Sequence, residues 1–293
     1  MTISERRLAP DPGFDKTVVP LPIAAHPPAS SGEICPPTET ADRICKWSRA
    51  KTVLPLQRLL SLGVLGGLYI GLGGALATLA MSESSLGNGP TRWLGGLAFS
   101  LGLILVVIGG AELSTGNCLM AISHLRGTTT GREIWRNWSW SYAANAAGAL
   151  ALAWLVVLSG IYDAEPLHRT AIRIAETKLA LPAPQAFARG ILANMLVCFA
   201  VWLAMTSQSA TGKLVGIMFP VSAFVALGFE HSIANLYLIP VGMMVGATGT
   251  SLDFARNIIA VTAGNAVGGA IVAGGLLWLG HGHVTELKPT RSN

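Results

Sequence analysis

Two short polar clusters interrupt long apolar stretches of this sequence, and they hold the residues best suited to chemistry. One runs from Glu112 to Asn117 and the other from Glu230 to Asn235, and a glycine precedes each. The second cluster contains His231, the only histidine deep within an apolar stretch. A neutral imidazole donates one hydrogen bond and accepts another, and an imidazolium donates two. Such a group could hold a small anion or exchange a proton with it.

The other polar residues of the clusters have two sets of roles. Thr115 and Asn117 could donate hydrogen bonds to an anion or to His231, and Asn117 could instead cap the helix that follows. His231 could equally be a buried neutral histidine bonded to the backbone. Glu112 and Glu230 are interpreted as structural, bonded to backbone N–H groups near the clusters, because a carboxylate would repel an anion.

The composition indicates what elements surround these clusters. Apolar residues make up 51% of the chain and charged residues 12%, whereas a soluble domain carries about a quarter charged residues. Because a membrane-spanning helix needs about 20 mostly apolar residues, the uncharged stretches predict an all-α membrane protein with six transmembrane helices. The expected spans are residues 58–81, 92–124, 134–160, 185–207, 214–248 and 256–280.

The second and fifth spans are longer than one crossing needs, and the polar clusters break them. In each cluster, asparagine follows glutamate after five residues, and the two clusters are 118 residues apart. Asn145 and Gly148 recur as Asn265 and Gly268, 120 residues on. These matches indicate an internal duplication of three spans, and an odd number of spans inverts the second copy. The prediction is an inverted repeat with two broken helices, an architecture typical of transporters.

A helix break inside a membrane points to a pore. Irregular backbone survives in hydrocarbon only where protein buries it or where it lines a wet cavity. The N-terminal end of a half-helix also offers unpaired N–H groups and partial positive charge, which favour an anion. Asn194, inside the fourth span, could line such a pore or form hydrogen bonds between helices.

The flanking segments and the other motifs set limits on function. Residues 1–54 are expected to form a disordered tail, with either a short amphipathic helix or a solvated basic linker near its end; residues 55–281 form the transport domain and residues 282–293 a second tail. The positions of Lys and Arg predict cytoplasmic termini in a cell membrane.

The net charge of +5 comes with no base-reading motif, so no nucleic-acid partner is expected. The four cysteines fit no metal or disulfide pattern, and no enzyme motif occurs. We expect no enzymatic activity, no cofactor and no metal.

Several segments resemble the formate/nitrite transporter family. They are Gly109–Asn117, Asn137–Gly148, Gly190–Asn194 with Val201 and Trp202, Gly228–Asn235 with Ile239 and Pro240, and Asn257–Gly269. The resemblance covers about residues 55–280 in order. It implies an aquaporin-like fold, assembled as a homopentamer in the lipid bilayer, with one pore per protomer for formate, nitrite, hydrosulfide, lactate or similar anions.

The resemblance also implies roles for single residues. His231 would be the central pore histidine, Thr115 its partner, Asn194 part of the polar lining, and Lys178 the lysine of the outer vestibule that attracts the anion. The two apolar constrictions would be formed by Phe99, Leu103, Leu113, Val197 and Phe224. Glu112, Gly116, Asn117, Glu230 and Asn235 would maintain the helix breaks.

The hypothesis that combines these features is a channel, or a proton-coupled transporter, for anions of weak acids. A weak acid avoids the cost of burying a bare charge by taking a proton, directly or through His231. The alternative is an aquaporin-like pore for small neutral solutes, although the paired Asn-Pro-Ala sequences of that class are absent. A membrane scaffold or sensor is a third possibility.

Overall fold

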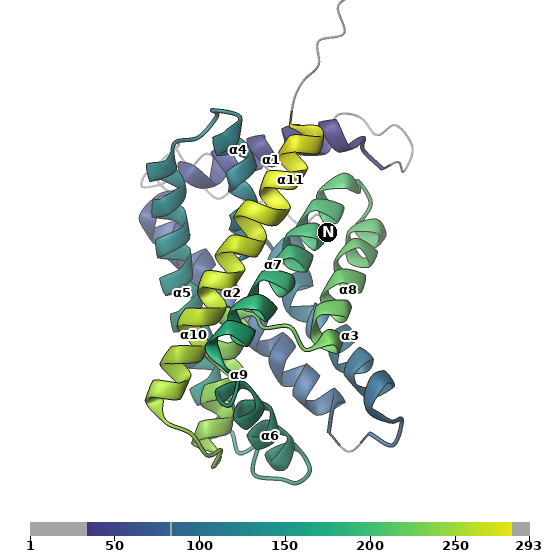
Figure 1. The fold of residues 1–293 in the computed structure, drawn as a ribbon, viewed down its shortest axis with the longest axis vertical. Helices are drawn as coiled ribbons and strands as arrows, with labels where there is room; N and C mark the ends of the chain where they lie inside the picture. The colour runs from purple at the N-terminus through teal and green to yellow at the C-terminus, as the bar shows by residue number, and fades with distance from the viewer. Residues whose placement is uncertain (1–33, 83, 283–293) are drawn as a thin grey trace, which may run out of the picture.

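The computed structural model describes residues 34–82 and 84–282 of the chain, and the elements it contains are helices and turns (Figure 1). In chain order they are α1 (Pro37–Thr52), α2 (Leu56–Ala80), α3 (Asn88–Gly109), the short 3-10 turn η1 (Gly116–Leu119), α4 (Met120–Leu125), α5 (Gly131–Leu158), α6 (Leu167–Leu179), α7 (Ala183–Thr206), α8 (Ala210–Leu227), α9 (Ser232–Met244), α10 (Ser251–Ala266), the π-helical segment η2 (Val267–Gly274) and α11 (Gly275–His281).

The helices form one elongated bundle with two distinct ends. Helices α1, α4 and α11 lie at one end, and α6 lies at the other, beside the connection from α2 to α3 (Figure 1). These are called the α1 end and the α6 end below. Within the part of the chain that the structure describes, six helices are long and apolar enough to cross a membrane. Large apolar side chains such as Ile259 and Ile271 are about 70% and 67% exposed on the bundle's outside, which is unusual for a water-soluble protein.

The expected spans agree with the helices, and the second and fifth are each divided. Helix α3 is followed by irregular backbone before η1 and α4, and α8 is followed by irregular backbone before α9. The sixth span differs from the expectation, because α10 continues through the π-helical segment η2 into α11.

Of the two alternatives for the stretch before the first span, the structure shows the helix, α1, with Ile44 fully buried against the bundle. The predicted disordered tail up to residue 33 and the C-terminal tail from residue 283 lie outside the described residues.

Glycines at matching positions let the helices of each half cross closely. A Cβ on Gly148 of α5 would collide with the carbonyl oxygen of Val64 on α2. A Cβ on Gly268 would collide in the same way with the carbonyl oxygen of Ile191 on α7. Small residues allow the backbones of membrane helices to approach each other, so these glycines fix the spacing of α2 with α5 and of α7 with the sixth span.

The repeat unit is larger than the three spans that the sequence predicts. Helix α1 precedes the first half and α6 precedes the second, and each ends in a similar sequence. Lys51, Leu54 and Pro55 recur with the same spacing as Lys178, Leu181 and Pro182. Each half therefore consists of a short end helix followed by three spans, and the two end helices lie at opposite ends of the bundle (Figure 1).

We predict that Gly268→Ala destabilises the protein, because the added methyl group must push α7 away from the sixth span. Overpacking of this kind costs about 1–3 kcal/mol, which should lower the thermal unfolding midpoint in detergent by several degrees. The control is Gly275→Ala, because Gly275 is helical and no described atom lies within 4 Å of the position of an added Cβ. Equal midpoints for the two variants would contradict this account of the helix crossing.

Candidate functional site

The two helix breaks lie at equivalent places in the two halves. Helix α3 ends at Gly109, and Gly110 adopts the left-handed conformation with φ of 82°. Helix α8 ends at Leu227, and Gly228 does the same with φ of 73°. A left-handed residue ends a helix readily when it is glycine, because no Cβ opposes the turn. The chain then runs irregularly until η1 begins at Gly116 and α9 begins at Ser232.

A buried carboxylate holds the first break in place. The Glu112 carboxylate accepts from the Lys51 ammonium at 2.5 Å and from Asn117 Nδ2 at 2.8 Å. Asn117 Nδ2 also donates to Asn137 Oδ1 at 2.8 Å. Glu112 and Lys51 are only 3% and 8% exposed in their side chains. The cluster ties the break to α1 and α5 and carries no net charge.

The second break is held by the same set of groups. Glu230 accepts from the Lys178 ammonium at 3.0 Å and from Asn235 Nδ2 at 2.6 Å, and Asn235 Nδ2 donates to Asn257 Oδ1 at 2.8 Å. Each cluster of one glutamate, one lysine and two asparagines is called a carboxylate clamp below. The partners predicted for the two glutamates were wrong, because both carboxylates bind side chains and not backbone N–H groups.

Two asparagines satisfy the backbone groups that the breaks release. Asn145 Oδ1 accepts from the Ser114 N–H at 2.9 Å, and its amide donates to the carbonyls of Glu112 and Gly63, both at 2.7 Å. Asn265 repeats this arrangement. Its Oδ1 accepts from the Ser232 N–H at 2.9 Å, and its Nδ2 donates to the carbonyls of Gly190 and Glu230. Asn117 does not cap a helix, because it lies inside η1 and no side-chain cap hydrogen bond is present at the start of η1 or of α4.

His231 connects the two breaks. Its Nδ1 accepts from the Ala234 N–H at 3.2 Å and so caps the start of α9. Because a backbone N–H can only donate, Nδ1 carries the lone pair and the proton of the neutral ring lies on Nε2. Nε2 lies 2.9 Å from Thr115 Oγ1, so His231 donates to Thr115. The Thr115 hydroxyl proton remains available for another acceptor.

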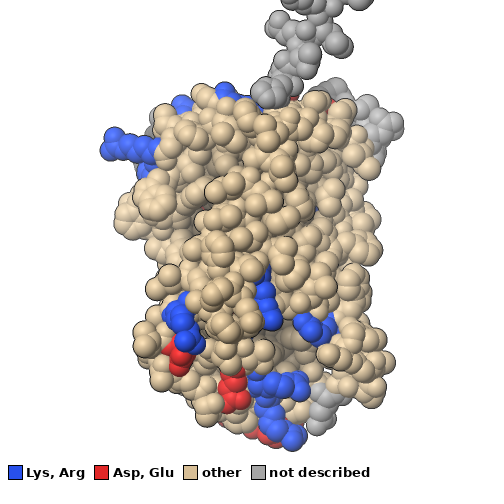
Figure 2. Space-filling model, in the orientation of Figure 1, with Lys and Arg blue, Asp and Glu red and all other residues tan. Residues whose placement is uncertain are grey.

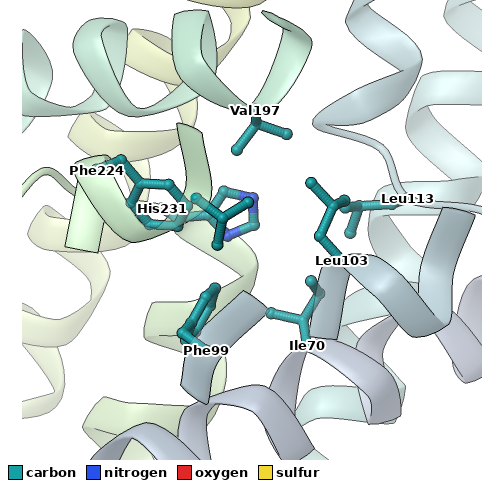
Figure 3. A pocket seen from close by; sticks show the side chains of 8 residues that line it. Ile70, Phe99, Leu103, Leu113, Val197, Phe224 and His231 are labelled. Atoms are coloured by element: carbon teal, nitrogen blue, oxygen red, sulfur yellow. The ribbon is translucent and has the colours of Figure 1, made fainter. Parts of the chain in front are cut away.

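A small cavity lies beside this histidine. It has a volume of about 10 Å³ and is lined by Ile70, Phe99, Leu103, Leu113, Val197, Val221, Phe224 and His231 (Figure 3). That volume is close to the least that holds one water molecule. The Phe99 and Phe224 rings meet edge to face at 5.5 Å, and Phe224 stacks on His231 at 6.1 Å. All five residues expected at the constrictions line this one cavity, and His231 is its single polar side chain.

The repeat explains most of the cavity lining. Ile70 and Val197 line it from α2 and α7 as equivalent residues of the two halves, because they follow Lys51 and Lys178 at the same distance along the chain. Leu103 and Val221 are 118 residues apart and form a second equivalent pair. The third pair is Leu113 and His231, also 118 residues apart. The repeat therefore places an imidazole in the second half where the first half has leucine.

Three of the expected pore residues, Thr115, Asn194 and Lys178, do not line the cavity, and Thr115 reaches it only through its contact with His231. Asn194 is fully buried, and its Nδ2 donates to the carbonyl of Thr115 at 3.2 Å and to that of Asn265 at 2.7 Å. Of the two alternatives for Asn194, the structure shows the interhelical hydrogen bonds. The Lys178 ammonium is not an isolated charge, because it is paired with Glu230 in the clamp.

Sequence reasoning missed other residues of the site. They are Lys51, the clamp asparagines Asn137 and Asn257, and the cavity residues Ile70 and Val221. The recurrence of lysine, leucine and proline with the same spacing before each half was a signal that could have identified Lys51 as the counterpart of Lys178. The same alignment of the two halves relates Ile70 to Val197.

Outside the spans, a carboxylate fixes α6, the helix that carries Lys178. The exposed Glu176 carboxylate accepts from the Thr248 hydroxyl at 2.6 Å and from the Thr248 N–H at 3.0 Å. These two hydrogen bonds lower the pKa of Glu176. They tie α6 to the segment between α9 and α10. In the described ranges, no group of three or more His, Cys, Asp or Glu side chains is arranged to hold a metal ion.

Comparison with known proteins gives consistent matches over most of the chain. The model of the family "Formate/nitrite transporter" matches residues 38–279. A "Probable formate transporter" of Methanothermobacter thermautotrophicus is 40% identical over 261 residues, which is 83% of this chain and 95% of that protein. The "Formate channel FocA" of Escherichia coli (strain K12) is 33% identical over 240 residues, covering 74% of this chain and 84% of that protein.

Solved structures show the same fold. A structure titled "FNT family ion channel" superposes with a TM-score of 0.76 at 27% identity and covers 83% of this chain and 99% of that one. Another, titled "Pentameric formate channel with formate bound", gives a TM-score of 0.68 at 34% identity, covering 76% and 96%.

We predict that Lys178→Met alone is strongly destabilising, because it leaves the buried Glu230 carboxylate without its cation. Removing one partner of a buried ion pair costs about 3–5 kcal/mol. The double variant Lys178→Met/Glu230→Gln should recover much of this loss, since the amide oxygen of the glutamine can still accept from Asn235. Thermal unfolding of the two single variants and the double variant gives the coupling between the sites. Additive effects would show that the pair does not hold the break.

Proposed function

The chain belongs to the formate/nitrite transporter family, and we propose that it forms a pore that carries formate, or a similar small anion of a weak acid, across a membrane. The observation that carries the proposal is the small apolar cavity between two helix breaks, with His231 as its one polar side chain. The pore for neutral solutes is not favoured, because the family and the relatives are described as transporters and channels for formate or nitrite.

The assembly and orientation are part of this proposal. A relative of the same fold is titled as pentameric, and we take a homopentamer in the cell membrane, with one pore in each protomer, as the working form. We place the α1 end at the cytoplasm, because Arg126 after α4 and Arg132 and Arg136 in the first turns of α5 lie at that end, and basic residues favour the cytoplasmic side. The described chain begins and ends at this same end (Figure 1).

The cavity discriminates by charge. A formate ion entering it would lose its hydration shell among aliphatic and aromatic side chains and meet no cation there. Burying an unpaired charge in this way is very costly. A weak acid avoids the cost when its carboxylate takes a proton from water at the mouth, crosses as the neutral acid, and returns the proton to water on the other side. One proton then crosses with each anion, and the passage moves no net charge.

His231 and Thr115 receive the neutral acid. Nδ1 of His231 is occupied by the Ala234 N–H, so protonating the ring would break the cap of α9. We therefore assign His231 the role of a neutral donor that orients the Thr115 hydroxyl, and Thr115 the role of donating its proton to the carbonyl oxygen of the acid. The imidazole is then a positioning group and not the source of the transported proton.

The first test is the dependence on pH and on membrane potential. Formate uptake into proteoliposomes at a fixed total concentration should rise as the external pH falls, because the protonated fraction increases. A potassium diffusion potential of either sign should leave the rate unchanged. Vesicles without protein measure the leak of formic acid through lipid. Uptake that follows the potential would instead show that the ion crosses with its charge.

The second test separates hydrogen bonding from proton transfer at His231. In His231→Asn, the side-chain oxygen can accept from Ala234 and the amide can donate to Thr115, but the side chain does not titrate. We expect this variant to keep formate uptake within about threefold of the natural protein. His231→Phe, which removes both hydrogen bonds, should lose at least about tenfold, as expected for about 1.4 kcal/mol of lost hydrogen bonding. If the asparagine variant loses uptake as completely as the phenylalanine variant, the imidazole does more than donate and accept.

A further inference from the structure

Two arginine side chains approach the same residue, Gly228, at the second helix break, on the α6 side of the cavity. Arg92 lies in the first turns of α3 and Arg189 in the second turn of α7. Nη1 of Arg189 is 3.5 Å from the carbonyl oxygen of Gly228. Nη2 of Arg92 lies against the same residue, at the place where a Cβ on Gly228 would stand. Because Gly228 comes three residues before His231, both guanidinium groups flank the loop that carries the pore histidine.

No carboxylate of the described residues neutralises their charges. At this end of the bundle the Lys178 ammonium is paired with Glu230 and Arg256 is paired with Asp253. Within residues 34–82 and 84–282, no carboxylate lies within ion-pair distance of Arg92 or Arg189. Figure 2 shows Lys and Arg atoms around a recess in the lower part of the molecule, which is the α6 end. The arginine pair therefore supplies positive charge that the clamp lysine does not.

Gly228 makes this arrangement possible in two ways. Its φ of 73° is the left-handed conformation that ends α8, which glycine adopts without strain. The same absence of a side chain leaves the space that the Arg92 guanidinium occupies. Gly228 thus both ends α8 and leaves room for the Arg92 guanidinium beside the break.

The pair belongs to one half of the repeat only. The position equivalent to Arg92 in the second half is Ala210, 118 residues further along the chain. The position equivalent to Arg189 in the first half is Leu62, because each follows its clamp lysine, Lys178 or Lys51, by 11 residues. Neither Ala210 nor Leu62 is charged. The nearest basic residue on the corresponding helix, α8, is Lys213, three residues beyond Ala210. The two halves share their carboxylate clamps, so the arginine pair is a feature that distinguishes one mouth from the other.

We propose that Arg92 and Arg189 form a binding site for a planar oxyanion, such as a carboxylate or nitrite, at the α6 mouth of the pore; this rests on the function proposed above. A guanidinium presents parallel N–H groups that match the two oxygens of such an anion, whereas an ammonium acts as a point charge. Both side chains are partly buried, so salt screens them less than it screens a charge in open water.

The site makes the two mouths unequal in affinity without driving net flow. A passive pore must have the same permeability in both directions at low concentration, so the site cannot set the direction. It lowers the concentration at which entry from the α6 end becomes half-saturated. At the α1 end the positions that the repeat relates to the two arginines, Leu62 and Ala210, carry no charge, so entry from that end saturates at a higher concentration.

The experiment measures half-saturation of formate flux from each end in proteoliposomes. Orientation is read from Leu252→Cys, an exposed position at the start of α10, with a maleimide that does not cross lipid; the four native cysteines are buried. The variants are Arg92→Gln/Arg189→Gln and Arg92→Lys/Arg189→Lys. Lys213→Gln is the control on α8, and thermal unfolding midpoints check that all variants fold.

For entry from the α6 end, Arg92→Gln/Arg189→Gln should raise the half-saturation concentration by about tenfold or more, since hydrogen bonds to charged groups are worth more than about 1.4 kcal/mol. Arg92→Lys/Arg189→Lys should raise the half-saturation concentration by a smaller factor, so that it stays above that of the natural protein. Entry from the α1 end should keep its half-saturation in both, and Lys213→Gln should leave the α6 end unchanged.

Three outcomes would overturn the proposal. The first is an unchanged half-saturation concentration in Arg92→Gln/Arg189→Gln. The second is a half-saturation concentration in Arg92→Lys/Arg189→Lys equal to that of the natural protein. The third is an equal rise in the half-saturation concentration for entry from both ends. The second would mean that charge alone, and not the guanidinium fork, attracts the anion. If the natural protein itself carried no formate beyond the leak of empty vesicles, the proposed function would fail, and that result is separate from these three.

Discussion

The structure depends on satisfying the backbone groups that two broken helices release inside the bundle. A helix that stops within a membrane leaves N–H and C=O groups with no water to bind. Asn145 and Asn265 each take one freed N–H and two carbonyls, and the carboxylate clamps fix the ends of the same loops to neighbouring helices. The rest of the site depends on these bonds. The two breaks can lie opposite each other around the cavity only while both loops keep their irregular conformation.

The clamps are symmetric, and the chemistry is not. Equivalent residues line the cavity in pairs, and the pair that differs in polarity is Leu113 and His231. An imidazole at one of two equivalent places gives the cavity a single donor and a single direction of hydrogen bonding, from His231 to Thr115. Because Nδ1 caps α9, the fold selects the tautomer. The position of the ring proton is thus a consequence of helix geometry.

The spans, their breaks and the central residues could be predicted because those signals are local. Long uncharged stretches mark the helices, and a polar cluster with a glycine before it marks each break. The partners of Glu112 and Glu230 could not be read in this way, since Lys51 and Lys178 lie 61 and 52 residues away along the chain. Nothing local distinguishes Ile70 or Val221 from other apolar residues of their helices. Hydrophobic patterns show that a residue is buried, and only the arrangement of the helices shows that it lines the cavity.

The neutrality of the clamps decides where the molecule can recognise an anion. Each lysine near the pore is paired with a glutamate, so its field falls off as that of a dipole and attracts an ion weakly at a distance. The cavity offers no cation either. In the function that we propose, recognition of charge therefore occurs before the cavity, where side chains without described acidic partners meet water, and recognition of the neutral acid occurs inside it. Separating the two steps lets one pore attract an ion at its mouth without trapping it at the centre, because a charge strong enough to hold the ion there would also prevent its release.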